Sequence, residues 1–292
     1  MPAMESPSDQ MIAKPAPGAV MPMNVAHLDQ ALSLSQAVQW PYRVEDWAFA
    51  LGLGRGFVVK RGQQVVGTAL WWPYGEDYAS MGMIIVADDA QRQGIGARLM
   101  AAMLADAADR TIILNSTLEG AALYTRLGFK PYGAVYQHQA ILQQAPTSER
   151  SLQMRAFTPQ DQDELEALDR TASGMDRRAL LNALYPMADI IVAQADGRIT
   201  GYACVRRWGR GVVIGPVIAR DAEDAKALIA TLAARHVGGF VRIDVTLASG
   251  LSPWLESIGL PQVHDVVSMS LGQPPKAGPE ATLFALSNQS LG

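Results

Sequence analysis

The chain has 292 residues, enough for two domains of about 100–150 residues each. Hydrophobic residues make up 49% of it and charged residues 18%, with a formal net charge of −4. This balance excludes a general nucleic-acid binder, which would need a basic surface. The single cysteine, Cys204, excludes an intrachain disulfide, and its apolar neighbours predict a buried packing role.

No window of the chain reaches the ~18 apolar residues that a membrane-spanning helix needs, and the N-terminus lacks the apolar stretch of a secretory signal. We therefore expect a cytoplasmic protein without a membrane partner, and we expect no metal site. Residues 1–20, which contain several prolines and small polar residues, predict a disordered tail.

After residue 20 the chain alternates short strands with helices. Periodicity and turn residues predict, in order, a strand at 21–26, helices at 28–38 and 45–51, a hairpin at 56–72, a strand at 78–86, a helix at 94–108, a strand at 111–115, a helix at 119–127 and a strand at 133–142. Gly62 and Gln63 are expected at the hairpin tip, and Gly128 is expected to end the last helix in a left-handed conformation. The final strand is expected to close the unit.

A linker at 146–151 is followed by a second run of elements in the same order. These are a strand at 152–156, a helix beginning at Pro159, a hairpin at 189–205, a strand at 211–217, a helix at 222–235, a strand at 241–247, a helix at 254–258 and a closing strand at 264–271. Asp196 and Gly197 predict the hairpin turn. The charged segment 173–181 predicts a solvated surface, with a contact across the domain interface as the alternative.

Two pairs of short segments align when the second run is laid over the first. VVGTA at 65–69 falls on ITGYA at 199–203, and RLGF at 126–129 falls on SIGL at 257–260. The sequence therefore indicates a tandem duplication of one mixed α/β domain, because each copy is large enough to own a core.

We accordingly expect a first domain at 21–145, a second domain at 152–272 and a C-terminal tail at 273–292. The tail begins as a linker. Three apolar residues near its end are expected to dock at a position that the sequence does not give, namely Leu283, Phe284 and Leu286.

The segment DDAQRQGIGARLM, residues 88–100, lies between a predicted strand and a predicted helix. Gly94 and Gly96 have no side chains, so the main-chain amides at the helix start are open to a ligand. Free amides and the helix dipole attract an anion, and Arg92 and Arg98 add positive charge. The pattern is neither a P-loop nor a dinucleotide-binding fingerprint. The residues alone leave two interpretations open, an anion site or merely a tight turn.

QRQGIGA, placed after IIV, closely resembles the acyl-CoA pyrophosphate loop of the GNAT acetyltransferase superfamily, and ALYTRLGF resembles that superfamily's L-Y-x-x-x-G-F segment. The second run carries IGPV, IDVT, WLESIGL and a late Met269, which are similar to features of a bacterial two-domain subgroup with a C-terminal domain of YitH type. The resemblance covers residues 21–272. It implies an α/β (mixed α+β) fold class with tandem GNAT folds, each a mostly antiparallel central sheet flanked by helices.

The resemblance also implies acetyl-CoA as the acetyl donor, with its pyrophosphate on the loop 91–97 and its pantetheine arm beside the strand 83–86. The thioester would then lie between that strand and the strand at 111–115. The implied cofactor-binding residues are Ile84, Ile85, Val86, Gln91, Arg92, Gln93, Gly94, Ile95, Gly96 and Ala97. Tyr124 would be the catalytic residue, donating a hydrogen bond or a proton to the departing CoA sulfur, with a core tyrosine as the alternative.

The acceptor side of the site is expected among the first helices and the end of the hairpin. There WPYRVEDW (40–47) and WWPYGEDY (71–78) combine aromatic rings with carboxylates, which suits a small cationic or aromatic amine. The candidate substrate-binding residues, with a packing role at the domain seam as the alternative, are Trp40, Trp47, Trp72 and Tyr78. The general base stays unassigned; the candidates are a relayed water, Glu76, Asp77, Glu119 and His138.

The second copy lacks both features of the first. Three acids, Asp221, Glu223 and Asp224, crowd the helix start where the first copy has its glycine loop, and they would repel a pyrophosphate. Leu255 aligns with Tyr124. The sequence therefore predicts a catalytic first domain and a second domain that closes the acceptor pocket.

These features together predict an acetyl-CoA-dependent N-acetyltransferase that acts on the primary amine of a small molecule, without nucleic acid or metal, as a monomer or homodimer. Two alternatives stay open. One is a protein-lysine acetyltransferase, and the other is an acyl-CoA-binding sensor or assembly protein without turnover.

Overall fold

The structure, a computed structural model, describes residues 17–292, so most of the predicted N-terminal tail lies outside the described residues. We call residues 17–145 the N-terminal half and residues 152–292 the C-terminal half. The N-terminal half contains β1 (Val20–Pro22), η1 (Val25–His27), α1 (Leu28–Ala37), α2 (Val44–Leu53), β2 (Arg55–Arg61), β3 (Gln64–Tyr74), β4 (Tyr78–Val86), η2 (Asp88–Ala90), α3 (Ile95–Ala107), β5 (Thr111–Ser116), α4 (Leu118–Arg126) and β6 (Lys130–Ile141).

The C-terminal half repeats this order and adds one strand at the end. It contains β7 (Gln153–Ala156), η3 (Pro159–Asp161), α5 (Gln162–Ser173), α6 (Arg178–Leu184), β8 (Asp189–Ala195), β9 (Arg198–Trp208), β10 (Gly211–Ala219), α7 (Ala222–Ala233), η4 (Ala234–His236), β11 (Phe240–Thr246), η5 (Leu247–Ser249), α8 (Ser252–Ser257), β12 (Gln262–Leu271) and β13 (Thr282–Ala285). The predicted linker at 146–151 contains no helix or strand.

The predicted turn residues adopt the conformations that the sequence requires. Gly62 lies in the turn between β2 and β3 with φ +60°, and Asp196 and Gly197 join β8 to β9 with φ +52° and +75°. Gly128 follows α4 with φ +91°. Cys204 is fully buried, as predicted, and burial raises the pKa of its thiol. The first strand, β1, is shorter than predicted because the chain turns into η1 at Val25.

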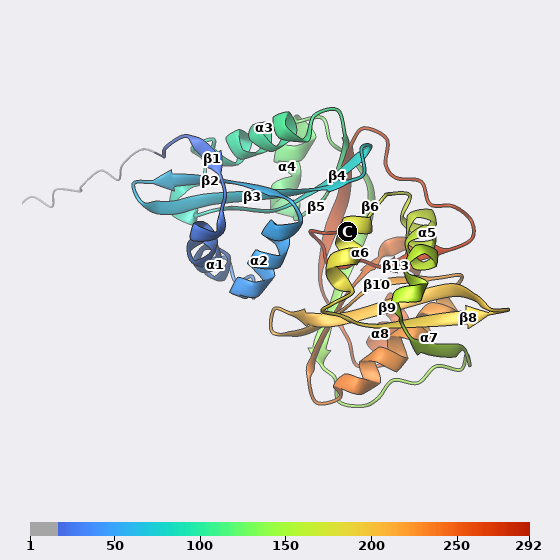
Figure 1. Cartoon of the computed structure of the whole chain (residues 1–292). Helices are drawn as coiled ribbons and strands as arrows, with labels where there is room; N and C mark the ends of the chain where they lie inside the picture. The colour runs from blue at the N-terminus through green and yellow to red at the C-terminus, as the bar shows by residue number, and fades with distance from the viewer. Residues whose placement is uncertain (1–16) are drawn as a thin grey trace, which may run out of the picture.

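Helices cover both faces of the N-terminal part of the sheet (Figure 1). On one face, α1 and α2 bury Ala31 and Trp47 against the strands. On the other face, α3 and α4 bury Leu99 and Tyr124. Strands β4 and β5 are therefore covered on both sides, and the gap between their ends faces the site described below.

The two halves form one continuous sheet because their last strands are exchanged. The order of the 13 strands in the described chain is β1-β2-β3-β4-β5-β12-β6-β11-β13-β10-β9-β8-β7. Strand β12 pairs with β5 through Val267–Leu271, and β6 pairs with β11 through Val135–Ile141. The expectation that each unit closes with its own last strand is therefore wrong: β6 and β12 lie side by side in the middle of the molecule (Figure 1).

The charged segment 173–181 is solvated only in part, because Arg178 is exposed while much of the rest is buried. Arg177 is fully buried, and its Nε and Nη2 atoms donate to the Asp169 carboxylate at 3.0 and 2.6 Å. Met175 and Leu180 pack into the core that contains Trp47 and Trp72. The alternative interpretation, a contact across the interface between the halves, is the one found, because the apolar side chains of α6 are drawn into the N-terminal core.

The predicted tail docks in two places, and we call residues 282–292 the C-terminal segment. Strand β13 is inserted between β10 and β11. The chain then crosses to the N-terminal half, where the Tyr74 hydroxyl donates to Leu291 O and Ser80 Oγ donates to Ser290 O at 2.7 Å. The C-terminus consequently lies between the halves (Figure 1).

Replacing Ser80 with alanine is expected to lower the free energy of unfolding by ~1–2 kcal/mol, because Ser290 O then loses its buried donor. Urea unfolding measures this change. Ser33→Ala removes a hydroxyl bonded to Asp29 O on an exposed helix, and we expect it to change stability by less than ~0.5 kcal/mol. Equal effects of the two variants would mean that the hydrogen bond from Ser80 to Ser290 O contributes nothing measurable to stability.

Candidate active site

The loop between β4 and α3 presents open backbone amides. Arg92 and Gly94 have φ +59° and +73°, and Gly94 is the N-cap of α3. The helix ladder begins with Arg98 N donating to Gly94 O at 3.0 Å, so the amides of residues 94–97 have no acceptor inside the helix. A Cβ on Gly94 would meet no atom within 4 Å. The loop is therefore an open concave set of donors that fits an anion.

Some side chains of this loop form hydrogen bonds within the chain, and others do not. Gln91 Nε2 donates to Asp88 Oδ1 at 3.0 Å, and Gln93 Nε2 donates to Asp89 O at 3.3 Å. Arg98 Nη1 donates to Gly18 O at 3.0 Å. Arg92 is exposed and has no hydrogen bond or ion pair to any residue in 17–292. Its guanidinium remains available to a ligand on the amides.

Strands β4 and β5 diverge just before this loop. They pair in parallel only from Tyr78–Met81 with Thr111–Leu114. Beyond that point Met83 has φ +51° and disrupts the register with β3, while β5 turns its other edge to β12 through Asn115 and Ser116. The edge of β4 at Ile84–Val86 that faces β5 is left without a strand partner among the described residues. An extended ligand such as a pantetheine arm fits this edge.

A cavity of about 580 Å³ opens at the point of divergence. Three parts of the chain line it: the N-terminal half, the exchanged strands with the β9–β10 turn, and the C-terminal segment. The lining includes Trp40, Tyr42, Met83, Ile84, Asn115, Gly120, Tyr124, Gln137, Gln139, Arg210, Arg242, His264, Gln289 and Ser290.

Tyr124 lies in this cavity on α4. Its side chain is 8% exposed, its ring contacts Phe129 edge-on at 5.9 Å, and its hydroxyl has no hydrogen-bond partner among residues 17–292. Burial raises the pKa of the Tyr124 phenol to about 12. The hydroxyl is thus a neutral donor that faces the cavity and is not engaged in packing interactions of its own.

The four aromatic residues predicted to bind the acceptor are separated by the fold. Trp40 lines the cavity. Trp47 and Trp72 are fully buried in the core, where their indole N–H groups donate to Ser35 Oγ and to Ala50 O. Tyr78 is half-buried at the start of β4 and packs against the same core. The cavity wall therefore contains Trp40 but not the other three.

The four side chains considered as general bases lie outside the cavity lining. His138 is fully buried, with Nδ1 2.8 Å from Leu260 O and Nε2 2.6 Å from Ser252 Oγ, which is a structural role. Glu76, Asp77 and Glu119 are exposed. His264, which sequence reasoning did not single out, does line the cavity.

Sequence reasoning also missed a group of polar residues on the exchanged strands and near them. We call this group the acceptor wall; its members are Gln137, Gln139, Arg210, Arg242 and His264. On β6 the two glutamines alternate with Tyr136 and His138 along the strand. This alternation in the sequence indicates that the two glutamines share one face of a strand. It does not indicate which strands pair with β6, so the other members of the acceptor wall could not be predicted.

The C-terminal half lacks the corresponding features. The N-cap of α7 is Asp221, whose carboxylate accepts from Asp224 N at 2.9 Å. Arg150 pairs with both of these acids, and Arg220 pairs with Asp224. Strand β13 fills the gap between β10 and β11 that corresponds to the β4–β5 gap. Leu255, aligned with Tyr124, is buried in the core.

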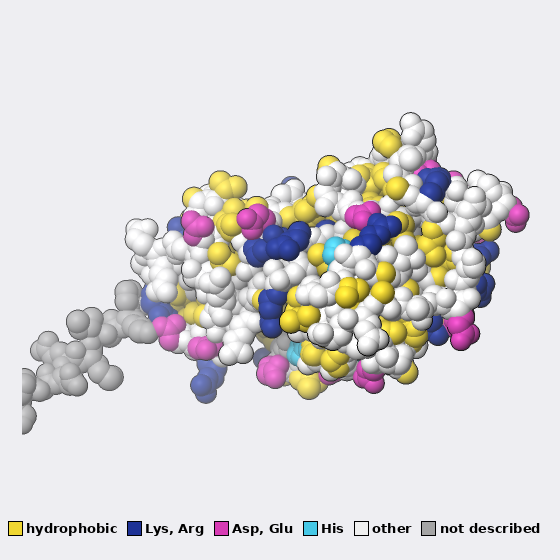
Figure 2. Space-filling view, turned by 90° about the horizontal axis from the view of Figure 1, so that it is seen from below, with side chains coloured by type: hydrophobic (Ala, Val, Ile, Leu, Met, Phe, Trp, Pro, Cys, Tyr) yellow, Lys and Arg dark blue, Asp and Glu magenta, His cyan; other side chains and the backbone are white. Residues whose placement is uncertain are grey.

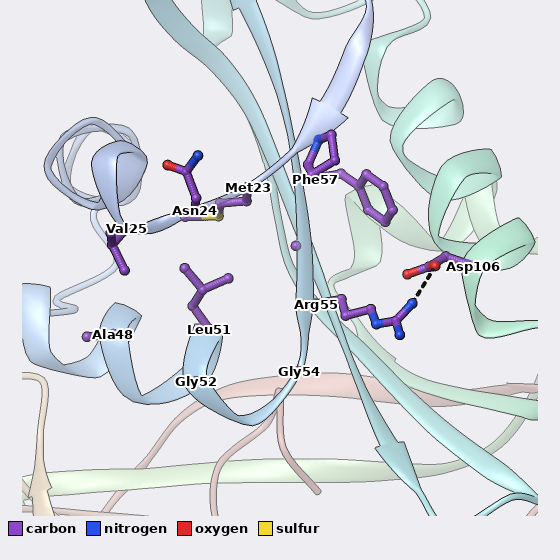
Figure 3. A pocket seen from close by; sticks show the side chains of 12 residues that line it. Met23, Asn24, Val25, Ala48, Leu51, Gly52, Gly54, Arg55, Phe57 and Asp106 are labelled. Carbon is purple, nitrogen blue, oxygen red and sulfur yellow. Dashed lines mark hydrogen bonds and ion pairs between the residues drawn. The ribbon is translucent and has the colours of Figure 1, made fainter.

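A second cavity, of about 610 Å³, lies between α2 and β2 near residues 22–25 (Figure 3). Its lining is mainly apolar, with Leu51, Val25 and Phe57 labelled in the view. Two charged residues in the lining bind each other, because Arg55 Nη1 donates to Asp106 Oδ1 at 2.8 Å. Tyr124 does not line this cavity, so we place no chemistry in it.

Surface and metal-binding features add no further site. The face in Figure 2 shows basic and acidic side chains interspersed with apolar and uncharged ones. Within residues 17–292, no three His, Cys, Asp or Glu side chains gather as a metal site would require. None of the helices in that range has both the length and the apolar character needed to cross a bilayer.

Residues 53–131 and 165–285 each match an acetyltransferase (GNAT) domain. The chain belongs to the GNAT acetyltransferase family and carries two such domains in tandem, in agreement with the mixed α/β fold and its mostly antiparallel sheet.

Among known proteins, the chain is 33% identical over 169 residues to an uncharacterised N-acetyltransferase, YitH, of Bacillus subtilis; the match covers 57% of this chain but only 60% of that protein's length. It is 25% identical over 224 residues to a holothin acyltransferase of a Pseudoalteromonas species, with 75% of each chain covered. A solved structure from Pyrococcus horikoshii, a proposed acetyltransferase, matches with a TM-score of 0.79 over 99% of this chain and 100% of that one. At 18% identity this last likeness shows the fold alone.

Proposed function

We propose that this chain is an acetyl-CoA-dependent N-acetyltransferase for the primary amine of a small molecule, and that its N-terminal half carries out the reaction. The observation that supports this assignment is an arrangement of three features at the diverging ends of β4 and β5. Tyr124 and Ile84, on the free edge of β4, line one cavity, and the open amides at 94–97 follow β4 outside the lining of that cavity. In the C-terminal half the corresponding positions hold acids, an inserted strand and Leu255.

The proposed reaction is a direct transfer. The neutral amine nitrogen attacks the thioester carbonyl carbon, the bond from that carbon to sulfur breaks, the ammonium proton passes to water or a base, and the sulfur receives a proton. Tyr124 donates its O–H hydrogen bond to the sulfur as negative charge develops there. A donor already aimed at that charge stabilises the transition state more than the ground state.

The cavity wall supports a small acceptor. Strands β6, β11 and β12 together with the C-terminal segment close the side of the cavity that faces the C-terminal half. These strands block the approach of a folded protein surface from that side of the cavity. The names of the two relatives, an N-acetyltransferase and a holothin acyltransferase, support acyl transfer for those proteins, and we extend it to this chain.

The proposal is tested by measuring free thiol released from acetyl-CoA by the full chain across a panel of small amines. We expect at least one amine to release thiol and to yield its N-acetyl product by mass spectrometry. Calorimetry with acetyl-CoA is run in parallel. If acetyl-CoA bound but no amine released thiol, the sensor alternative would be favoured. If acetyl-CoA did not bind, both the enzyme proposal and the sensor alternative would be contradicted.

The rate is expected to rise with pH until the acceptor amine is deprotonated. A primary amine with a pKa near 10.4 is neutral in about one molecule in a thousand at pH 7, so kcat/KM gains about tenfold per pH unit below that pKa. Tyr124 must be protonated to donate, and burial raises its pKa to about 12, so its active form persists throughout this rise. A descending limb between pH 8 and 10 that Tyr124→Phe abolishes would contradict this assignment.

A further inference from the structure

Four members of the acceptor wall lie on one face of the sheet formed by β11, β6 and β12, and the fifth, Arg210, lies on the turn between β9 and β10. In the antiparallel register Arg242 on β11 lies opposite Gln139 on β6, and Gln137 lies opposite His264 on β12. Directly paired residues of neighbouring strands project to the same face. The face that lines the cavity therefore carries a contiguous row of polar side chains, and it exists only because β6 lies between β11 and β12.

A chain of hydrogen bonds orients the amides of this face. Asn115 Nδ2 donates to Gln289 O at 2.8 Å, Gln289 Nε2 donates to Gln137 Oε1 at 3.2 Å, and Gln137 Nε2 donates to Gln139 Oε1 at 2.9 Å. The side-chain oxygens of Gln137 and Gln139 therefore each accept a hydrogen bond from the chain itself. The Nε2 group at the end of this chain, on Gln139, has no acceptor among the described residues and is left as a donor toward the cavity.

Arg242 is held rigidly and keeps one free edge. Its Nε and Nη2 atoms donate to the fully buried Asp244 carboxylate at 2.9–3.1 Å. Its Nη1 atom has no partner among residues 17–292 and is not closed off from solvent. The ion pair fixes the guanidinium plane, so the free edge is pre-organised for a second planar acceptor.

Arg210 adds a positive charge that no carboxylate of the described chain neutralises. Its guanidinium lies 5.3 Å from the centre of the Phe240 ring, and it forms no ion pair with residues 17–292. The turn that carries it is fixed on the N-terminal half, because Gly209 N donates to Asp46 Oδ2 at 2.8 Å and a Cβ on Gly209 would lie 3.1 Å from Pro41 O. The contact between the two halves therefore fixes the position of the turn that carries Arg210.

The carboxylates expected at the acceptor side are directed elsewhere. Asp46 is buried, and it accepts from Arg43 and from Gly209 N. Glu45 and Glu76 are exposed outside the lining. The cavity lining within residues 17–292 contains two arginines and four glutamine or asparagine side chains from β5, β6 and the C-terminal segment, but neither Asp nor Glu. The sequence-based expectation was a small cationic or aromatic amine. This lining disfavours an acceptor that carries only positive charge and favours one that also carries an anionic group.

We propose that the acceptor is an amine that also carries a carboxylate, and that Arg210, the free edge of Arg242 and Gln139 bind that carboxylate while Trp40 and Tyr42 pack against the rest of the molecule. This inference rests on the proposed acetyl transfer and adds the class of substrate. A carboxylate offers two coplanar oxygens, which match the forked donors of arginine.

The test compares three forms of one acceptor: phenylalanine, phenylalaninamide and phenethylamine. Phenylalaninamide gives the sharpest comparison. It lacks the negative charge of the carboxylate, and its amine loses a proton more easily than that of phenylalanine, so amine reactivity alone would favour the amide. We expect kcat/KM for the acid to exceed the values for the amide and for the decarboxylated amine by ~10-fold or more, the worth of a charge-assisted hydrogen bond. A tryptophan series and a phosphonate analogue show whether the preference is for any anion or for a carboxylate.

Arg210→Glu is expected to raise the KM for the acid by ~10-fold or more while the KM for acetyl-CoA changes less than twofold. Arg207→Glu is the matched control, because Arg207 is exposed on the same hairpin, changes charge equally and does not line the cavity. Arg242→Lys keeps the charge beside Asp244 and removes the fork, so it is expected to weaken the acid preference without unfolding the chain, which circular dichroism checks.

The outcomes separate this inference from the function on which it rests. Thiol release with the amide or phenethylamine at least as fast as with the acid, or equal effects of the Arg210 and Arg207 variants, would overturn the carboxylate subsite and leave acetyl transfer intact. Failure of acetyl-CoA to bind, with no release from any amine, would overturn the proposed function itself.

Discussion

Replacing Gly94 with glutamate is expected to raise the dissociation constant of acetyl-CoA by about 100-fold or more, measured by calorimetry. A Cβ at this position meets nothing within 4 Å, so the new side chain fits and leaves the surrounding packing undisturbed. The cost arises from charge, because a carboxylate about 5 Å from a diphosphate is repelled by ~3 kcal/mol per unit of charge at an effective dielectric constant near 20.

The controls for this substitution separate charge from backbone strain. Gly197 has φ +75°, close to the +73° of Gly94, and a Cβ on it also meets nothing within 4 Å. Gly197→Glu therefore imposes the same left-handed strain and the same charge at a distant turn, and it should leave acetyl-CoA binding unchanged. Gly94→Ala imposes the backbone strain without the charge. We expect it to lower the free energy of unfolding by ~1–2 kcal/mol and to weaken acetyl-CoA binding less than Gly94→Glu does. If Gly94→Glu bound acetyl-CoA as tightly as the parent chain, the amide loop would not be the pyrophosphate site.

Replacing Tyr124 with phenylalanine is expected to lower kcat by about 10²- to 10³-fold while the dissociation constant of acetyl-CoA stays within about twofold. The loss is that of one donor aimed at developing charge. Because burial raises the phenol pKa to about 12, complete proton transfer to a thiolate is uphill, and the stabilisation comes mainly from the hydrogen bond. Steady-state kinetics with a saturating amine measures the change.

Stability is not expected to account for that loss. The Tyr124 hydroxyl has no hydrogen-bond partner among residues 17–292, so its removal leaves no buried group unpaired. Tyr185→Phe is the matched control, since the Tyr185 hydroxyl is buried without a partner in the C-terminal half. That variant should be fully active. A Tyr124→Phe enzyme with parental kcat would exclude the hydroxyl from the mechanism.

The exchange of β6 and β12 makes the second domain part of the structure around the first site. Its last strand, β12, completes the N-terminal part of the sheet beside β5, and β11 contributes Arg242 to the cavity through its pairing with β6. Its own gap between β10 and β11 is filled by β13. The C-terminal half thus serves, in this proposal, as the wall of the first site.

The candidate site was predictable from sequence where its residues are adjacent in the chain. The residues of the loop at 91–97 left an anion site and a tight turn open, and the resemblance of two short local segments, QRQGIGA and ALYTRLGF, to GNAT motifs singled out this loop and Tyr124. Arg210, Arg242 and Gln289 are far apart in sequence, and no local pattern relates them to the loop or to Tyr124. Trp47 and Trp72 show the converse error, because aromatic density in a sequence does not distinguish a core from a pocket.

The sequence by itself determined the tandem repeat of mixed α/β units, the positions of most helices and turns, and the loss of the glycine loop in the second copy. These depend on local periodicity, turn chemistry and capping, which act over a few residues. Only the tertiary structure decided which strands pair, where residues 282–292 dock and which side chains face the acceptor. Strand order depends on contacts between segments more than a hundred residues apart, such as Ser268 with Asn115, and local sequence patterns do not contain these contacts.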